Sequence, residues 1–146
     1  MEVKDVCKSF KIVHHYFENQ LNSNLADLNL TRAQMDILFF LKRNERKNNE
    51  VNQKDIEKEF SLKNPTVTGI LDRLEDKGYI KREVSSKDKR YKKILLTQSS
   101  QLILSDGRNH AKKIGEQLLE PLNADEKEDL KKLLDKIINN IKEETC

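Results

Sequence analysis

The residues of this chain that could do chemistry are hydroxyl-bearing and cationic side chains between residues 64 and 93. Thr66 and Thr68 directly follow Pro65, and their hydroxyl groups can donate hydrogen bonds to phosphate oxygens or to base edges. Arg73 lies further along the same stretch and can hold a phosphate or a guanine. Four lysines further along can neutralise a phosphate backbone: Lys87, Lys89, Lys92 and Lys93.

A helix is expected to position the two threonines. Asn64 has the side chain of a helix cap, and Pro65 stands in the first turn, where its missing N–H costs nothing. Gly78 is expected to end the helix in a left-handed conformation. Apolar residues recur at helical spacing on one face: Val67, Ile70, Leu71 and Leu74. The opposite face is small and polar: Pro65, Thr66, Thr68, Gly69, Asp72, Arg73 and Asp76.

The basic residues fall where the period changes from helical to strand-like. Residues 79–84 and 92–97 have the composition of two short strands, and the polar tip from Ser85 to Tyr91 predicts a hairpin between them. From Lys81 to Lys93 there are seven Lys or Arg and two acids, a local net charge of +5, whereas the whole chain carries only +3. A helix with a small polar face followed at once by a basic hairpin predicts a winged helix-turn-helix.

The preceding segments supply the other helices of this core. Thr31 is expected to cap a mostly buried helix that starts at Arg32, and residues 42–50 are polar throughout and predict a turn or the approach to a strand. Asn52 and Asp55 have the spacing of a capping box at the start of a short helix. Ile56 and Phe60 are its expected apolar contacts, so this helix would be the first of the helix-turn-helix.

At these residues the sequence resembles the MarR family of transcriptional regulators, named for multiple antibiotic resistance. The resemblance rests on NPTVTGILDRLEDKGYIKRE and KDKRYKKILLT, and extends more loosely over nearly the whole chain. The second stretch is similar to the family's wing pattern D-x-R-D-x-R, of which Asp88 and Arg90 are retained while Ser85 replaces the first acid. Gly69 stands where many relatives carry a longer side chain. The resemblance implies a dimeric DNA-binding regulator, by family precedent a repressor, with a small-molecule pocket between core and dimer helices.

We therefore predict a mainly α protein: a winged helix-turn-helix core with a two-stranded β wing, flanked by N- and C-terminal dimerisation helices. It would form a single MarR-like domain over residues 1–146, with the DNA-binding region at 31–97 and the helical dimerisation region at 1–25 and 98–146. Arg90 is expected to enter a minor groove, with Asp88 orienting it. The predicted DNA-binding residues are Pro65, Thr66, Thr68, Arg73, Lys87, Asp88, Lys89, Arg90 and Lys92.

The expected partners are double-stranded DNA with an inverted-repeat operator, a second copy of the chain and a small-molecule effector. Apolar residues between Val3 and Leu21 repeat in steps of three and four, and a second apolar stripe runs from Leu130 to Ile141. One copy of so small a core cannot cover both stripes, which favours a two-fold dimer. An intramolecular bundle is the alternative. The predicted activity is repression relieved by a small-molecule or redox signal.

Composition narrows the class of protein. Charged residues make up 36% and aromatics 5% of 146 residues, with a mean hydropathy of −0.81, which suits a helical protein with long solvated faces. No apolar run approaches the roughly 18 residues that span a bilayer. The N-terminus lacks a signal peptide's apolar region. Cys7 and Cys146 lie near opposite ends, so the expected location is the cytoplasm, with free thiols.

Enzymatic motifs do not occur, so no enzyme activity, catalytic residue or cofactor is predicted. His14 and His15 are adjacent and would point about 100° apart on a helix, which argues against a shared metal. Cys7 has Lys4 and Lys8 nearby, which could lower the pKa of its thiol for redox sensing, although a packing role is the alternative.

A rival class is a winged-helix protein-interaction module without DNA binding. In that case the acidic residues of the predicted recognition helix would face a protein: Asp72, Glu75 and Asp76. Steep salt dependence of binding to duplex DNA separates the two classes.

Overall fold

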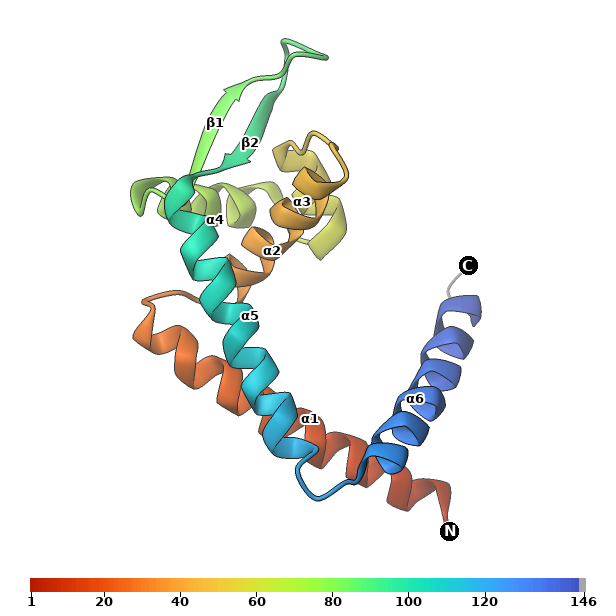
Figure 1. The fold of residues 1–146 in the computed structure, drawn as a ribbon. Coiled ribbons are helices and arrows are strands. Elements are labelled where there is room, and N and C mark those ends of the chain that lie inside the picture. The colour runs from red at the N-terminus through yellow and green to blue at the C-terminus, as the bar shows by residue number, and fades with distance from the viewer. Residues whose placement is uncertain (145–146) are drawn as a thin grey trace. The chain divides into compact units, whose positions relative to one another are not determined.

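The computed structural model describes residues 1–144 and is mainly α-helical (Figure 1). Cys146 lies outside the described residues. The order of elements confirms the predicted fold class, a winged helix-turn-helix with helices on both sides. The elements are α1 (Val3–Asp27), α2 (Arg32–Arg46), α3 (Gln53–Phe60), α4 (Asn64–Asp76), β1 (Ile80–Val84), β2 (Lys92–Leu96), α5 (Gln98–Leu118) and α6 (Ala124–Glu144).

These elements group into two compact units, Met1–His110 and Ala111–Cys146, with the division inside α5. The first unit contains the winged helix-turn-helix, α1 and the start of α5. The second contains the end of α5 and α6. The single-domain organisation stays a prediction. None of the helices in residues 1–144 has the length and apolarity that a membrane span requires.

The core of the first unit joins the helix-turn-helix to the wing. All four apolar residues predicted on the inner face of α4 are buried, which confirms that face. Burying one such side chain stabilises a fold by about 1.5–3 kcal/mol, more than a helix cap, so packing fixes the orientation of α4. The fully buried members of this core are Ile37, Leu38, Ile56, Val67, Leu71, Leu74, Ile80 and Leu104.

The start of α4 differs from the prediction in one respect. Its N-cap is Lys63, which makes no side-chain capping bond, so Asn64 is the first helical residue and not the cap. The Asn64 side chain instead donates through Nδ2 to Glu57 Oε1 of α3 at 2.7 Å, a hydrogen bond to a charged acceptor. The amide of Asn64 therefore attaches α4 to α3.

The end of α4 is as predicted. Gly78 adopts φ +75, the left-handed conformation that glycine tolerates best. Its N–H donates to the Glu75 carbonyl at 2.8 Å, and the Tyr79 N–H donates to the Leu74 carbonyl at 2.9 Å. These two bonds form a Schellman motif, which stops the helix and turns the chain into β1.

The ends of α2 and α3 test the other predicted boundaries. The capping box at Asn52 with Asp55 is confirmed, and the predicted cap at Thr31 is confirmed as part of a capping box with Gln34. The predicted polar turn over residues 42–50 is wrong in its first half, because α2 continues to Arg46. Lys42 Nζ donates to Glu45 Oε2 at 2.6 Å in this exposed last turn. Such a pair of charged side chains three residues apart supports a helical turn that has no apolar side chain facing the core.

The wing is a two-stranded antiparallel hairpin that extends beyond the three central helices (Figure 1). Its register pairs Ile80 with Leu96 at the base and Val84 with Lys92 near the tip. The base is anchored on both sides, since Ile80 and Ile94 are buried and the Ile94 N–H donates to the Val51 carbonyl at 2.8 Å. Both predicted strands are confirmed to within a residue, and the root of the wing is fixed while its tip reaches outward.

The terminal helices carry the predicted apolar stripes. In the first unit, Leu25 at the end of α1 joins the core, whereas Val3, Phe10 and Val13 are exposed. A bond of 3.0 Å between His110 Nε2 and the Gln20 carbonyl ties the start of α5 to α1. In the second unit, Asn123 and Glu126 form a capping box before α6. The exposed apolar residues of α6 are Leu133, Ile137, Ile138 and Ile141.

Gly69→Ala is expected to stabilise the protein. A Cβ at Gly69 would meet only Arg73 Nη1, at 3.9 Å, which is an ordinary contact. Because alanine is the better helix former, the free energy of unfolding should rise by about 0.5–1 kcal/mol in denaturant titrations. Gly78→Ala is the matched control and should lose about 1–2 kcal/mol, since its φ of +75 disfavours a side chain. A loss of stability in Gly69→Ala would contradict the open space seen here.

Candidate nucleic-acid interface

The first turns of α4 present the predicted polar surface. Pro65 and Thr66 are exposed, and Thr68 is half-buried beside them. Arg73 is exposed, and its guanidinium lies back over Gly69. The sequence placed these four side chains on the face opposite the core, and the structure brings them together there. A helix N-terminus with small side chains can approach a phosphate closely.

A hydrogen-bond network holds this end of α4 against α3. Gln53 Nε2 donates to Thr68 Oγ1 at 2.8 Å and lies 3.3 Å from Glu57 Oε1. Asn64 Nδ2 donates to the same Glu57 oxygen. The two helices of the helix-turn-helix are therefore joined by polar side chains at the edge of the proposed contact surface. Sequence reasoning missed this network, because its members lie on separate helices.

An ion pair joins α4 to the base of the wing. The Arg82 guanidinium of β1 donates to Asp72 and lies 3.7 Å from Glu75, both on α4. Asp72 and Glu75 are exposed, whereas Arg82 is half-buried. The contact orients the wing relative to α4 and neutralises part of the acidic side of that helix. No local sequence signal marks it, since the partners are ten and seven residues apart.

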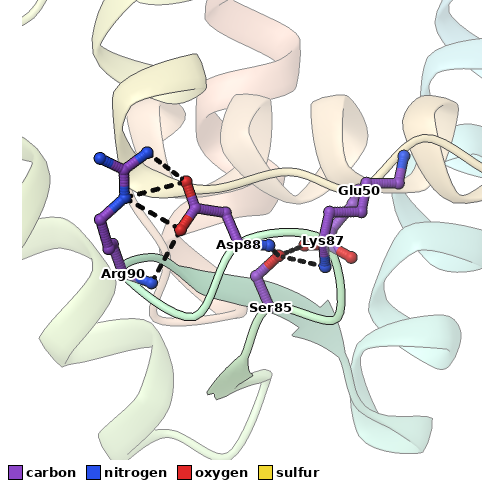
Figure 2. Close-up of polar contacts among 5 residues, drawn as sticks. All are labelled: Glu50, Ser85, Lys87, Asp88 and Arg90. Atoms are coloured by element: carbon purple, nitrogen blue, oxygen red, sulfur yellow. Dashed lines mark hydrogen bonds and ion pairs between the residues drawn. The ribbon is translucent and has the colours of Figure 1, made fainter.

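Ser85 organises the tip of the wing (Figure 2). Its hydroxyl accepts from the backbone N–H groups of Lys87 and Asp88, at 3.1 and 3.2 Å, and donates to Glu50. Ser85 is buried although it lies in a polar loop. The residue that replaces the family's first wing acid therefore closes the turn through its hydroxyl. Glu50 was not singled out from the sequence, because nothing local to it indicates a partner in the wing.

The Glu50 carboxylate is stabilised in its charged form by this contact. The hydrogen bond from Ser85 holds the pKa of Glu50 below its usual value, and Ser86, Lys93 and Lys87 lower it further. Ser86 donates to the other carboxylate oxygen at 3.1 Å. Glu50 precedes Val51, whose carbonyl accepts a hydrogen bond from the Ile94 N–H of β2. The tip and the base of the wing are therefore both bonded to the segment between α2 and α3.

Asp88 and Arg90 form a close ion pair at the far end of the loop (Figure 2). Arg90 Nη2 lies 2.7 Å from Asp88 Oδ2, and Arg90 Nε lies 3.0 Å from Asp88 Oδ1. This pairing lowers the pKa of Asp88 and raises that of Arg90. The Arg90 side chain is still 81% exposed, so its guanidinium has a fixed direction and an open face. This is the contact that an orienting role of Asp88 requires.

The lysines of the wing differ in their surroundings. Lys87, Lys89 and Lys92 are exposed, as a role in neutralising phosphates requires. Lys93 is half-buried and lies 3.9 Å from Glu83, so part of its charge is already balanced. Lys54 of α3 was missed from the sequence and lies over the Tyr91 ring at 5.3 Å, which extends the basic surface from the wing to α3.

The histidines and Cys7 lie apart from this surface. Cys7, His14 and His15 are exposed on α1, and His15 is bonded to Asn19. Within residues 1–144, no group of three or more His, Cys, Asp or Glu side chains is arranged to hold a metal ion.

Ser85→Ala is expected to raise the pKa of Glu50 toward its ordinary value of 4.5, because the largest lowering contact is lost. Ser86→Ala is the matched control and should raise it less. The folded pKa lies below the unfolded one, so the contact stabilises the fold above pH about 4.5 and this stabilisation is lost as pH falls through the lowered folded pKa. NMR titration of the Glu50 carboxyl measures the change. An unchanged pKa in Ser85→Ala would contradict the geometry of the tip.

Comparisons with known proteins agree with this geometry. A model of the MarR family matches residues 28–90, which span α2, α3, α4, β1 and part of the loop at the tip of the wing. A point mutant of MepR from Staphylococcus aureus is 25% identical, with a TM-score of 0.82 over 97% of this chain and 99% of that one. An S. aureus MepR–DNA complex is 26% identical, with a TM-score of 0.72 over 90% of this chain and 96% of that one. A mutant of MarR from E. coli is 25% identical, with a TM-score of 0.75 over 94% and 97%.

Proposed function

We propose that the chain is a member of the MarR family and a sequence-specific DNA-binding regulator of transcription that acts as a homodimer in the cytoplasm. One observation carries the proposal: the exposed first turns of α4 and the basic wing are fixed to each other through Arg82 and through the helix-turn-helix core. The MepR structure solved with DNA, which this fold resembles, supports it.

In this proposal α4 enters a major groove and the wing follows the neighbouring backbone. Thr66 and Thr68 donate to phosphates or base edges, and Arg73 holds a phosphate or a guanine. The exposed lysines supply the sequence-independent attraction to phosphates. Figure 1 shows the hairpin projecting beyond the helices, where it can reach a flanking groove. The contacting residues are Pro65, Thr66, Thr68, Arg73, Lys87, Asp88, Lys89, Arg90 and Lys92.

The dimer is proposed from the apolar faces left exposed in each unit. Val3, Phe10 and Val13 of α1 are exposed, as are Ile137 and Ile138 of α6. Exposed apolar stripes of this length indicate an interaction surface. A two-fold axis would then present two copies of α4 to successive major grooves, so the operator would be an inverted repeat with half-sites about one helical turn apart.

A protein-interaction module is less well supported, because the acidic surface it needs is partly neutralised. Arg82 pairs with Asp72 and approaches Glu75, so of the three acids only Asp76 lies outside this contact. The basic wing beside these residues favours a polyanion instead. The two functions differ in how binding responds to salt.

Affinity for duplex DNA across a salt series tests the proposed function. A dimer that contacts six to ten phosphates should lose about 10³–10⁵ in affinity between 50 and 200 mM salt. A duplex selected from a random pool should bind at least about 10³-fold more tightly than an unselected one. Binding that is weak, insensitive to salt and equal for both duplexes would refute the proposal.

Arg90→Ala is expected to cost more affinity on operators with A/T-rich flanks than on G/C-rich ones. A narrow A/T minor groove concentrates negative potential, and Arg90 is the exposed arginine that Asp88 points outward from the tip. Lys92→Ala is the matched control: it should weaken both operators equally and lower the salt slope by about one unit. The measurement is affinity for two operators that differ only in their flanks. Equal losses in Arg90→Ala would reduce the wing to a plain electrostatic anchor.

Repression, and its release by a small-molecule or redox signal, complete the proposal. Both follow from the family resemblance. The exposed position of Cys7 leaves its thiol open to oxidants, which a redox signal requires. Transcription from a promoter containing the selected operator, with and without oxidant and candidate ligands, would test both points.

A further inference from the structure

Gln53, the first residue of α3, lies against the first turns of the recognition helix. Its Nε2 atom is 2.8 Å from Thr68 Oγ1 and 3.4 Å from the Asn64 carbonyl oxygen. The same atom is 3.3 Å from Glu57 Oε1. One nitrogen therefore faces three oxygens, and the shortest of the three contacts is to the threonine hydroxyl.

The surroundings fix which end of the Gln53 amide faces Thr68. A carboxylate and a backbone carbonyl can only accept hydrogen bonds. The amide atom facing Glu57 and the Asn64 carbonyl must therefore be the NH₂ group, since the reversed amide would set its oxygen against both. Glu57 is itself held in place by Asn64 Nδ2 at 2.7 Å.

This orientation also fixes the direction of the Thr68 hydroxyl. Because Thr68 Oγ1 accepts from Gln53, its own proton is left to donate elsewhere. A helical threonine can donate to the carbonyl four residues earlier, which here is Asn64, but that oxygen already accepts the Thr68 N–H of the helix and faces Gln53 Nε2, so both of its lone pairs are used. Among residues 1–144 no acceptor is seen for this proton. Thr68 is half-exposed on the outward face of α4, so the proton can point to a ligand.

We propose that Gln53 is a positioning residue that sets the Thr68 hydroxyl as a hydrogen-bond donor, so that Thr68 selects an acceptor on the DNA. This inference rests on the proposed function. The acceptors available are a phosphate oxygen, a purine N7, guanine O6 and thymine O4. The exocyclic amino groups of adenine and cytosine are donors and would be disfavoured at that position. Gln53 thereby contributes to specificity without having to touch the DNA.

The experiment uses the full-length protein and an operator selected by it from a random duplex pool. Affinities are measured for wild type, Thr68→Val, Gln53→Glu and Gln53→Met. Each protein is tested on the operator and on duplexes that lack one acceptor at a time, by methylphosphonate or 7-deazapurine substitution. The first chemistry reports on phosphate and the second on a base edge. An unselected duplex measures the general loss that an added charge causes.

Thr68→Val should bind the operator about fivefold to twentyfold more weakly than wild type. On the one duplex that lacks the acceptor bound by Thr68, wild type and Thr68→Val should bind with equal affinity. Gln53→Glu turns the partner of Thr68 into an acceptor that captures its proton. After correction by the unselected duplex, Gln53→Glu should lose as much as Thr68→Val, and adding Thr68→Val to it should cost nothing further. Gln53→Met, which leaves the hydroxyl free to rotate, should lose about twofold to fivefold.

Two results would overturn the inference. The first is additive losses for Gln53→Glu and Thr68→Val, which would make the two residues independent. The second is wild-type affinity and acceptor dependence in Gln53→Met, which would make the amide dispensable. Gln53→Met carries no new charge, so it keeps the test open if Gln53→Glu folds poorly. Failure to select any preferred duplex would refute the proposed function instead, so the two failures are distinguishable.

Discussion

Replacing Leu134 and Ile138 of α6 by aspartate is expected to convert the protein from a dimer to a monomer. The two side chains lie one turn apart on the apolar face of the helix, and Ile138 is 44% exposed in the single chain. In the dimer each carboxylate would be buried without a partner, at about 3–5 kcal/mol apiece. Four such groups per dimer outweigh the roughly 8 kcal/mol of a micromolar association. Light scattering at micromolar concentration measures the result.

The same variant should lose operator affinity. Each half-site would then bind on its own, without the effective concentration that a dimer provides, so affinity should fall by about 10²–10⁴. Lys136→Asp is the matched control, because Lys136 lies on the opposite, solvated face of α6 and should leave both dimer and affinity nearly unchanged. A stable wild-type monomer at micromolar concentration would contradict the proposed assembly outright.

Thr66→Ala combined with Thr68→Ala should weaken operator binding by about 1–3 kcal/mol, which is up to some hundredfold. Thr66 is exposed and Thr68 half-buried at the N-terminal end of α4, where the helix dipole favours a phosphate. Loss of their hydroxyl groups removes hydrogen bonds to DNA and leaves the apolar face of the helix untouched. Affinity for the selected operator is the measurement.

Thermal unfolding separates this effect from a loss of structure. The double variant should unfold within a few degrees of wild type, because Thr66 is exposed and Gln53 Nε2 keeps Glu57 and the Asn64 carbonyl as acceptors when Thr68 loses its hydroxyl. Ser105→Ala, an exposed hydroxyl on α5, is the control and should not change DNA affinity. Wild-type affinity in the double threonine variant would remove α4 from the proposed interface.

The sequence predicted what local patterns determine. The apolar face of α4 appeared as four residues at helical spacing, and all four are buried. Gly78 was expected to be left-handed at the end of the helix and is found at φ +75. Two capping boxes and both strands were also predictable, since each depends on residues only a few positions apart.

The sequence could not predict contacts between distant segments. Asn64 looked like a cap, but Glu57 of the neighbouring helix takes its side chain. Ser85 looked like a departure from a family pattern, and its buried hydroxyl proves to close the loop against Glu50, 35 residues earlier. The last turn of α2 was missed because its side chains are solvated and carry no apolar period. For Asn64 and Ser85, contacts with a distant segment decided between local alternatives of similar energy.

In the proposed complex, two copies of α4 and of the wing bind one face of duplex DNA. A hydroxyl-radical footprint of the wild-type protein on its selected operator tests this most directly. We expect two symmetric protected segments centred about one helical turn apart. The minor grooves flanking them should also be protected, and this outer protection should weaken in Arg90→Ala. A single unsymmetric segment, or outer protection that Arg90→Ala leaves unchanged, would contradict this arrangement.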